Sequence, residues 1–191
     1  MNSIPDLTTE RLRLTVPDRA SARAVLDYFE RNRSHLEAWS PPAPDDFYTL
    51  DFWIRRAAIA RDELAAGRSL RLLVRPRHEP ARVIGTCNYT EVIRGGFQAC
   101  LLGYGLDQHQ VGKGLMEEAL RRSLDFVFTE FGLHRVMANY MPINQRSGAL
   151  LRRLGFVVEG YARDYLFING AWRDHILTAL NNPSPRPPRR P

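Results

Sequence analysis

A glycine-rich segment just past the middle of this 191-residue chain reads Leu102-Gly103-Tyr104-Gly105-Leu106-Asp107-Gln108-His109-Gln110-Val111-Gly112-Lys113-Gly114-Leu115-Met116. Its first residues predict a strand, and glycine inside a strand often marks a bulge or a close approach of backbone to a ligand. Its last residues open a long helical pattern, and the first N–H groups of a helix have no partner within the helix. The segment therefore predicts an anion site suited to a pyrophosphate, formed by the Gly112–Gly114 loop and the helix that follows it.

Three nucleotide-binding motifs compete for this loop. The P-loop requires Ser or Thr directly after Gly-Lys, and that residue is absent. The dinucleotide fingerprint requires a third glycine where the chain has Glu117, and it lies early in its domain. The third alternative is coenzyme A, whose pantetheine arm would bind along a splayed strand with free N–H and C=O groups. A tight turn without a ligand remains the plain alternative, and the position between a glycine-containing strand and a long helix favours a ligand.

Hydrophobic periodicity predicts a mixed α/β fold around this segment. Strands are expected at residues 12–16, 70–74, 82–90, 97–106, 135–140, 157–168 and 172–179, and helices at 18–31, 49–66, 115–131 and 145–154. Gly95-Gly96 and Asn169-Gly170 predict two hairpins. We expect one domain over residues 1–180 and a disordered Pro/Arg-rich tail over residues 181–191.

Composition restricts the class of protein. Hydrophobic residues make up 44% and charged residues 25%, which is typical of a soluble globular domain. No apolar run reaches the ~18 residues of a membrane span, and the first residues lack the layout of a signal peptide. Cys87 and Cys100 form neither a CxxC pair nor a metal spacing. We expect a cytoplasmic protein with reduced thiols and no metal site.

The positive charge of the chain comes almost entirely from arginine. The net charge is +6, and Lys113 is the only lysine among 27 basic residues. A compositional bias explains this as well as a basic surface for a nucleotide or RNA does. The two explanations stay open.

Longer motifs resemble the GNAT superfamily of N-acetyltransferases. The Gly112-Lys113-Gly114 loop is followed in order by a helix, a strand, Asn144-x-x-Ser147, a second helix and Leu154-Gly155-Phe156. Further strings resemble the RimJ-like branch, the ribosomal-protein alanine N-acetyltransferases. These strings are Asn32–Pro41, Val92–Gly95, His134–Pro142, Gly155–Leu166 and Asn169–His175. The resemblance covers nearly the whole chain except the tail.

The resemblance implies a fold and a cofactor site. The fold would be a mixed, mostly antiparallel twisted sheet of about seven strands flanked by about four helices. Acetyl-CoA would be bound by Leu102, Tyr104, Leu106, Val111, Gly112, Lys113, Gly114, Leu115, Met116, Asn144 and Ser147. The superfamily usually has Gln or Arg where this chain has Val111, so a side-chain contact to the pyrophosphate is in doubt. The backbone donors of Gly112 and Gly114 do not depend on it.

The resemblance also implies direct transfer of the acetyl group to an amine. A backbone N–H of residues Tyr104–Leu106 is expected to stabilise the oxyanion. Ser147 is expected to be the acid, as in the RimL branch, and that branch's glutamate falls at Leu166 here. The base therefore stays open. The candidates for the base are Glu91, Glu159, Asp164, Asp174 and tyrosines such as Tyr165. Tyr104 is expected to belong to the catalytic set together with Ser147. Trp39 and Tyr165 are expected to bind the acceptor.

Three functions remain open from the sequence. The first is acetylation of a protein N-terminus, with the alanine terminus of a ribosomal protein first. An α-amine has a pKa of about 7.7–8.0 and a lysine amine one of about 10.4, so a site without a strong base suits N-termini. The second is acetylation of a small amine, such as an amino acid, a polyamine or an antibiotic. The third is non-catalytic contact with RNA or the ribosome through the arginines.

Overall fold

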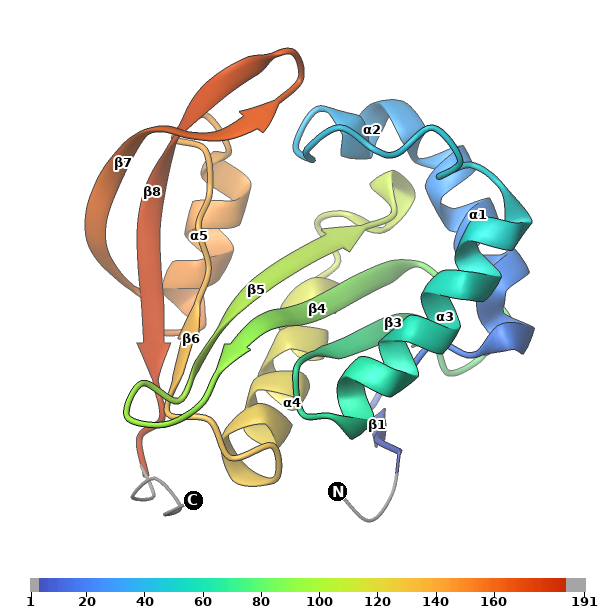
Figure 1. Cartoon of the computed structure of the whole chain (residues 1–191), viewed down its shortest axis with the longest axis horizontal. Coiled ribbons are helices and arrows are strands. Elements are labelled where there is room, and N and C mark those ends of the chain that lie inside the picture. Colours follow the sequence, from blue (N-terminus) through green and yellow to red (C-terminus); the bar gives the residue numbers. More distant parts are fainter. Residues whose placement is uncertain (1–3, 185–191) are drawn as a thin grey trace.

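The computed structural model describes residues 4–184. Eight strands form one sheet in the order β1-β2-β3-β4-β5-β6-β8-β7 (Figure 1). The strands are β1 (Asp6–Thr8), β2 (Leu12–Thr15), β3 (Leu70–Pro76), β4 (Gly85–Ile93), β5 (Ala99–Leu106), β6 (Arg135–Met137), β7 (Val157–Ile168) and β8 (Ala171–Asn181). All neighbouring strands are antiparallel except β5 and β6, which are parallel.

Five α-helices and two 3-10 turns connect the strands. They are η1 (Arg19–Ser21), α1 (Ala22–Arg31), α2 (Arg33–Glu37), α3 (Leu50–Ala65), η2 (Gln108–Gln110), α4 (Leu115–Thr129) and α5 (Gln145–Arg153). The predicted α/β fold with a mixed, mostly antiparallel sheet is confirmed.

The two faces of the sheet carry different helices (Figure 1). On one face the side chains of Cys87 and Tyr89 lie against α4, where the Tyr89 and Ser123 hydroxyls are 2.8 Å apart. Alternate residues of a strand point to opposite faces, so Leu73 packs on the other face with Val25 of α1. The larger core lies under α4 and the smaller one under α1 and α3.

The structure differs from the sequence-based prediction in the shortest elements and at several strand ends. The prediction of seven strands and four helices missed β1 and α2, which have three and five residues and are too short to show a period. Strand β4 begins at Gly85 and β5 at Ala99, later than expected. Strand β6 ends at Met137, because the chain beyond it turns from β5 towards β8, and Tyr140 forms only an isolated bridge with Ile176.

The last strand ends near residue 180, where we expected the domain to end. Strand β8 ends at Asn181, and the Asn182 N–H donates to the carbonyl of His134 at 2.7 Å. The rest of the predicted tail, residues 185–191, lies outside the described residues. Between residues 4 and 184, no helix is long and apolar enough to cross a membrane.

Candidate functional site

Strands β5 and β6 separate after three residue pairs. Ala99, Cys100 and Leu101 pair with β6, and no pairing continues beyond Leu101. From there β6 is followed by residues bonded to β8, with the Ala138 N–H donating to the carbonyl of Thr178 at 3.0 Å. The second half of β5 therefore has an open edge, along which alternate residues present N–H and C=O groups without a strand partner.

A cavity of about 820 Å³ fills this opening, and we call it the split cavity. Among its lining residues are Leu102, Tyr104, Leu106, Val111, Gly112, Gly114, Leu115, Met116, Asn144 and Ser147. The structure thus brings together every residue predicted to hold the cofactor except Lys113, whose Nζ instead donates to Oε1 of Gln110 at 3.1 Å. A volume of this size is in the range of small-molecule sites.

The glycine loop has the backbone that an anion site requires. Gly112 has φ +83° and Gly114 has φ +74°, both in the left-handed region that side chains disfavour. Gly114 is the N-cap of α4 and has no side chain to satisfy the first N–H groups of the helix. No atom lies within 4 Å of the position that a Cβ would take at Gly112. The open space and the free donors fit a pyrophosphate.

Arginine side chains border the same cavity from α5. Arg146 and Arg153 line it and are seven positions apart, which places them on one face of the helix two turns apart. Arg153 donates to Glu117 at 2.8 Å. This hydrogen bond and the one from Arg121 lower the pKa of the Glu117 carboxyl. Sequence reasoning did not select either arginine, because the chain contains many others.

Tyr104 and Ser147 meet inside the cavity. Their hydroxyl oxygens lie 2.7 Å apart, one on β5 and one on α5. Asn144 positions the serine, because its Oδ1 accepts the Ser147 N–H at 3.1 Å and caps α5. Burial raises the pKa of Tyr104 to about 12, so the phenol keeps its proton at neutral pH. The two hydroxyls can act together as a proton donor at the split.

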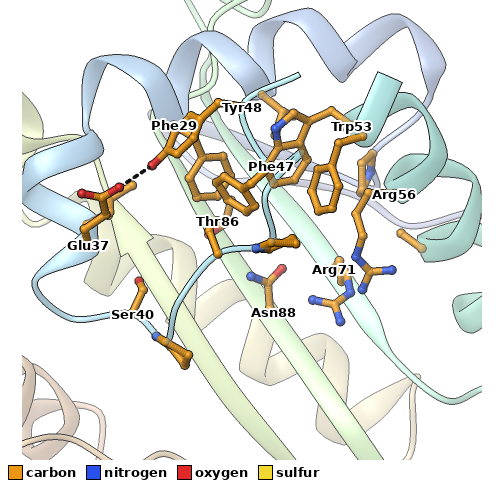
Figure 2. Close-up of a pocket in the computed structure, with 18 of the residues that line it drawn as sticks. Phe29, Glu37, Ser40, Phe47, Tyr48, Trp53, Arg56, Arg71, Thr86 and Asn88 are labelled. Atoms are coloured by element: carbon orange, nitrogen blue, oxygen red, sulfur yellow. Dashed lines mark hydrogen bonds between the residues drawn. The ribbon is translucent and has the colours of Figure 1, made fainter. Parts of the chain in front are cut away.

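A second chamber of about 560 Å³ lies on the α1–α3 side of the sheet. The two cavities adjoin, because they share six lining residues: Phe29, Leu36, Ser40, Pro41, Thr86 and Asn88. Aromatic side chains of α1, α3 and the loop before α3 form one wall (Figure 2). Asn169 and Gly170, at the tip of the β7–β8 hairpin, also line this chamber. A ligand in the split cavity can therefore meet a second ligand that enters from the other face of the sheet.

The predicted bases fall outside both cavities. Glu91 and Asp164 are exposed, and each lies at a bulge with positive φ, 51° in β4 and 46° in β7. Asp174 accepts the Asp164 N–H at 2.9 Å, and Glu159 pairs with Arg135. These carboxylates are structural or solvated groups in this arrangement.

The two predicted acceptor-binding residues take different positions. Trp39 lines the split cavity. Tyr165 does not, but its ring is 5.3 Å from that of His175 and its hydroxyl accepts from Nδ2 of Asn139 at 3.0 Å. Both partners line the cavity, so Tyr165 supports its wall from behind.

Sequence reasoning missed three further lining residues. His175 is buried in the wall, with its Nδ1 2.9 Å from the carbonyl of Arg173. When Nδ1 donates this bond, Nε2 is the acceptor. Thr86 and Asn88 of β4 lie where the two cavities meet. Their alternation with buried β4 residues was visible in the sequence, but which face of the sheet carried the ligand was not.

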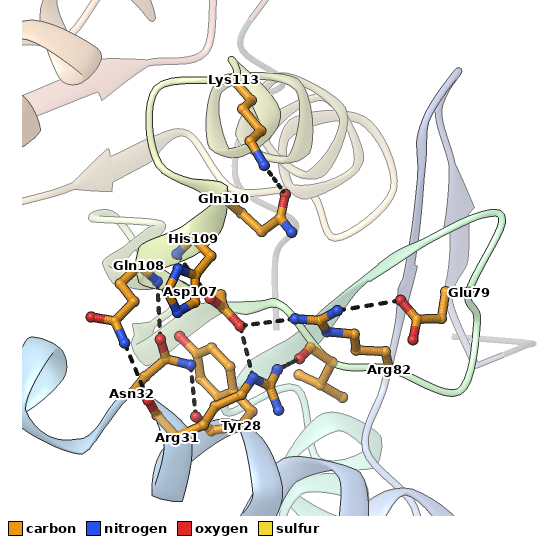
Figure 3. A network of polar contacts seen from close by, with 11 residues as sticks. Tyr28, Arg31, Asn32, Glu79, Arg82, Asp107, Gln108, His109, Gln110 and Lys113 are labelled. Carbon is orange, nitrogen blue, oxygen red and sulfur yellow. Dashed lines mark hydrogen bonds and ion pairs between the residues drawn. The ribbon is translucent and has the colours of Figure 1, made fainter.

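A buried ion pair ties α1 to the turn before the glycine loop (Figure 3). Asp107 is fully buried and its Oδ2 accepts from Nε of Arg31 at 2.7 Å. Asn32 of the same segment accepts the Gln108 N–H at 2.9 Å. These contacts fix where η2 leaves the sheet, and therefore where the glycine loop begins.

Comparisons with known proteins agree with this geometry. Residues 11–157 match the family model described as the acetyltransferase (GNAT) domain. The chain is 42% identical over 184 residues to the [ribosomal protein uS5]-alanine N-acetyltransferase of Escherichia coli (strain K12), covering 96% of this chain and 94% of that protein. The crystal structure of ribosomal-protein-S5-alanine acetyltransferase from Vibrio fischeri is 36% identical with a TM-score of 0.92, covering 96% of this chain and 100% of that one.

A further solved structure is that of Mycobacterium smegmatis RimJ in complex with CoA-disulfide. It is 28% identical with a TM-score of 0.84, and the match covers 93% of this chain and 86% of that one.

Proposed function

The chain belongs to the GNAT acetyltransferase family, and we propose that it acetylates the N-terminal α-amine of ribosomal protein uS5. The acceptor residue would be an N-terminal alanine, in line with the name of the Escherichia coli relative. The chain is an acetyl-CoA-dependent N-acetyltransferase, and the superfamily predicted from its motifs is confirmed. The observation that carries the proposal is the Tyr104–Ser147 hydroxyl pair, which lies between β5 and α5 in a cavity that adjoins a second chamber. Because ribosomes are its source of acceptor, the enzyme would work in the cytoplasm.

Acetyl-CoA would bind along the open edge of β5. The pyrophosphate would meet the free N–H groups at the start of α4, next to Gly112 and Gly114. Arg146 and Arg153 would add positive charge beside the phosphates. The pantetheine arm would pair with β5 in place of a strand, and the thioester would reach Tyr104 and Ser147 in the split. Val111 lines the cavity without supplying a polar group, so binding would depend on backbone donors there.

The transfer itself needs one proton taken from the amine and one given to the leaving sulfur. The neutral α-amine forms a bond to the thioester carbonyl carbon, and a backbone N–H on the open edge of β5 stabilises the oxyanion. The C–S bond then breaks, and the thiolate takes a proton from the Ser147 hydroxyl, which is hydrogen-bonded to Tyr104. Solvent restores the proton to this pair.

The amine proton goes to a weak base or to water. Both carboxylates that line the cavities are already paired, Glu117 with Arg121 and Arg153 and Glu37 with Arg33. Two histidines line the split cavity, His35 and His175, and we propose as the base the buried one, His175, whose Nδ1 lies 2.9 Å from the carbonyl of Arg173. A site of this strength suits an α-amine, because about a tenth of such amines is already neutral near pH 7.

The experiment that tests the proposal offers acetyl-CoA and matched acceptors to the enzyme. One peptide has a free alanine terminus, a second has the same sequence with a blocked terminus and an internal lysine, and the third acceptor is a polyamine. We expect a product only from the free terminus, read by mass spectrometry. Faster acetylation of the blocked peptide would overturn the α-amine assignment, and acetylation of the polyamine alone would favour a small-amine enzyme.

A further inference from the structure

The second chamber extends away from the split along rows of residues that cross the sheet. Arg71 of β3 is opposite Asn88 of β4, and Asn88 is opposite Gly103 of β5. Neighbouring strands lie about 4.8 Å apart, so Arg71 is about 10 Å from Gly103 across the sheet. Gly103 has no side chain, and no atom lies within 4 Å of the position that its Cβ would take. The space over Gly103 is therefore open, and Asn88, which lines both cavities, is the next residue of the row towards Arg71.

Two arginines at the far end of this row share one carboxylate. Oε2 of Glu63 lies 3.4 Å from Arg56 and 3.3 Å from Arg71. Ser69 donates to the same oxygen at 2.7 Å. Both arginines line the chamber and Glu63 does not.

The charge balance leaves the arginines able to bind an anion. Burial lowers the pKa of Arg71, the neighbouring charge of Arg56 lowers it further, and Glu63 and the more distant Glu91 oppose this effect. The exposed fractions of the two arginine side chains are 24% and 25%, so an anion that enters the chamber meets partly desolvated donors.

Between the split and the arginines the wall is aromatic (Figure 2). The rings of Phe29 and Trp53 stack at 4.7 Å with 8° between their planes, and Phe47 meets Trp53 edge-on at 4.9 Å. Figure 2 places Glu37 on one side of these rings and the two arginines on the other. The chamber therefore offers an apolar surface followed by positive charge.

We infer, on the basis of the proposed function, that the second chamber binds residues two to four of the acceptor polypeptide and that Arg71 and Arg56 select an acidic side chain at its third or fourth position. An extended chain spans about 3.4 Å per residue, so a peptide whose amine lies at the split reaches 10 Å away with about its third residue. The residue before the acidic one packs its side chain on Phe29 and Trp53. The enzyme thus reads several residues of its acceptor, beyond the first.

The test is a set of peptide amides that start with alanine and differ only in one residue. Glutamate stands at the third, fourth or sixth position, and each peptide has a glutamine twin. The wild-type enzyme should prefer glutamate over glutamine at the third or fourth position by about 10-fold in kcat/KM. This is the ratio expected from the free energy of one hydrogen bond between charged groups. Glutamate at the sixth position should give no preference. Equal rates for all twins would overturn the inference.

Variants separate a binding role from a structural one. Arg71→Gln should abolish the glutamate preference. Arg71→Glu should reverse it, so that a further peptide with lysine at the same position reacts faster than the glutamate peptide. Arg55→Gln is the matched control, because Arg55 is on the same helix as Arg56, pairs with Asp46 and lines neither cavity. It should keep the wild-type preference. A preference that survives in both Arg71 variants would overturn the assignment, and Arg56→Gln repeats the test if an Arg71 variant does not fold.

Two readouts keep this inference distinct from the proposed function. Acetylation of alaninamide, which is too short to reach the arginines, tests transfer alone. Calorimetric binding of the peptide twins to the coenzyme-loaded enzyme tests the subsite without turnover. A lack of product together with tighter binding of the glutamate peptides would refute the proposed acceptor and support the subsite. If product forms but the peptides bind equally well with and without glutamate, the proposed acceptor is supported and the subsite is refuted.

Discussion

The hydroxyl groups of Tyr104 and Ser147 lie 2.7 Å apart and join β5 to α5 across the open edge of the sheet. If they form one proton donor, Ser147→Ala and Tyr104→Phe should each lower kcat by about 100-fold, the lower range for a general acid. The dissociation constant of acetyl-CoA should change little, because an acid acts mainly in the transition state. The double variant should lose little more than either single one. A change in KM alone would reduce the pair to a binding contact.

The second prediction concerns the glycine loop. Gly112→Val should weaken acetyl-CoA binding by more than about 30-fold, because Gly112 has φ +83° and a branched side chain would enter the open space beside it. Calorimetry measures the affinity. Gly132→Val is the control, since Gly132 has φ +73° and lies at the far end of α4, outside the split cavity. It should lose stability and keep its affinity for coenzyme. Equal losses of affinity in both variants would contradict the assignment.

The third prediction is a pH profile with one rising limb. Below about pH 7.5, kcat/KM for an alanine-terminated peptide should rise about tenfold per unit and level off above about pH 8.5, as the α-amine loses its proton. Burial raises the pKa of Tyr104 to about 12, which favours the protonated phenol, so this donor is lost only as the pH rises towards that value. A fall in rate with an apparent pKa below about 9 would show that another group is the acid.

The fourth prediction concerns the fully buried carboxylate of Asp107. Burial opposes its ionisation, but hydrogen bonds from Arg31 and from the His109 N–H hold its pKa below the ordinary value. Because folding lowers this pKa, the ionised carboxylate stabilises the fold at any pH above the ordinary carboxyl pKa of about 3.9. This contribution is lost as the pH falls from that value through the lower pKa of the folded state. Asp107→Asn should therefore cost about 3 kcal/mol of unfolding free energy near pH 7, because it leaves the Arg31 guanidinium without its carboxylate partner.

The matched control for Asp107 is Asp6, whose pair with Arg13 is exposed at the edge of the sheet. Asp6→Asn should cost less than about 1 kcal/mol. Urea unfolding at pH 7 and again well below the ordinary carboxyl pKa, at about pH 2.5, measures both variants. A difference between the wild type and Asp107→Asn that does not shrink in acid would mean that the carboxylate acts through packing alone.

The parts of the molecule that sequence reasoning predicted are those with local signals. The glycine loop, the long helix after it and the Asn169-Gly170 hairpin each depend on residues close together in the chain. The second chamber depends on α1, the loop before α3, and strands β3 and β4, so no local pattern shows it. The Arg31–Asp107 pair joins residues 76 positions apart. A pattern of acidic residues also cannot tell which carboxylates face a cavity, and Glu91 and Asp164 face solvent.

The three residue pairs between β5 and β6 have a mechanical consequence. Among the described residues, they are the only strand pairing between a sheet half of five strands, β1 to β5, and a half of three, β6 to β8. A bound pantetheine arm would bridge the gap beyond Leu101 and make the two halves one stiff body. Loading with coenzyme should then slow amide hydrogen exchange in β8 as well as in β5, and departure of free coenzyme after each turnover should loosen both halves together. The rate of that loosening would set an upper limit on how fast the enzyme can cycle.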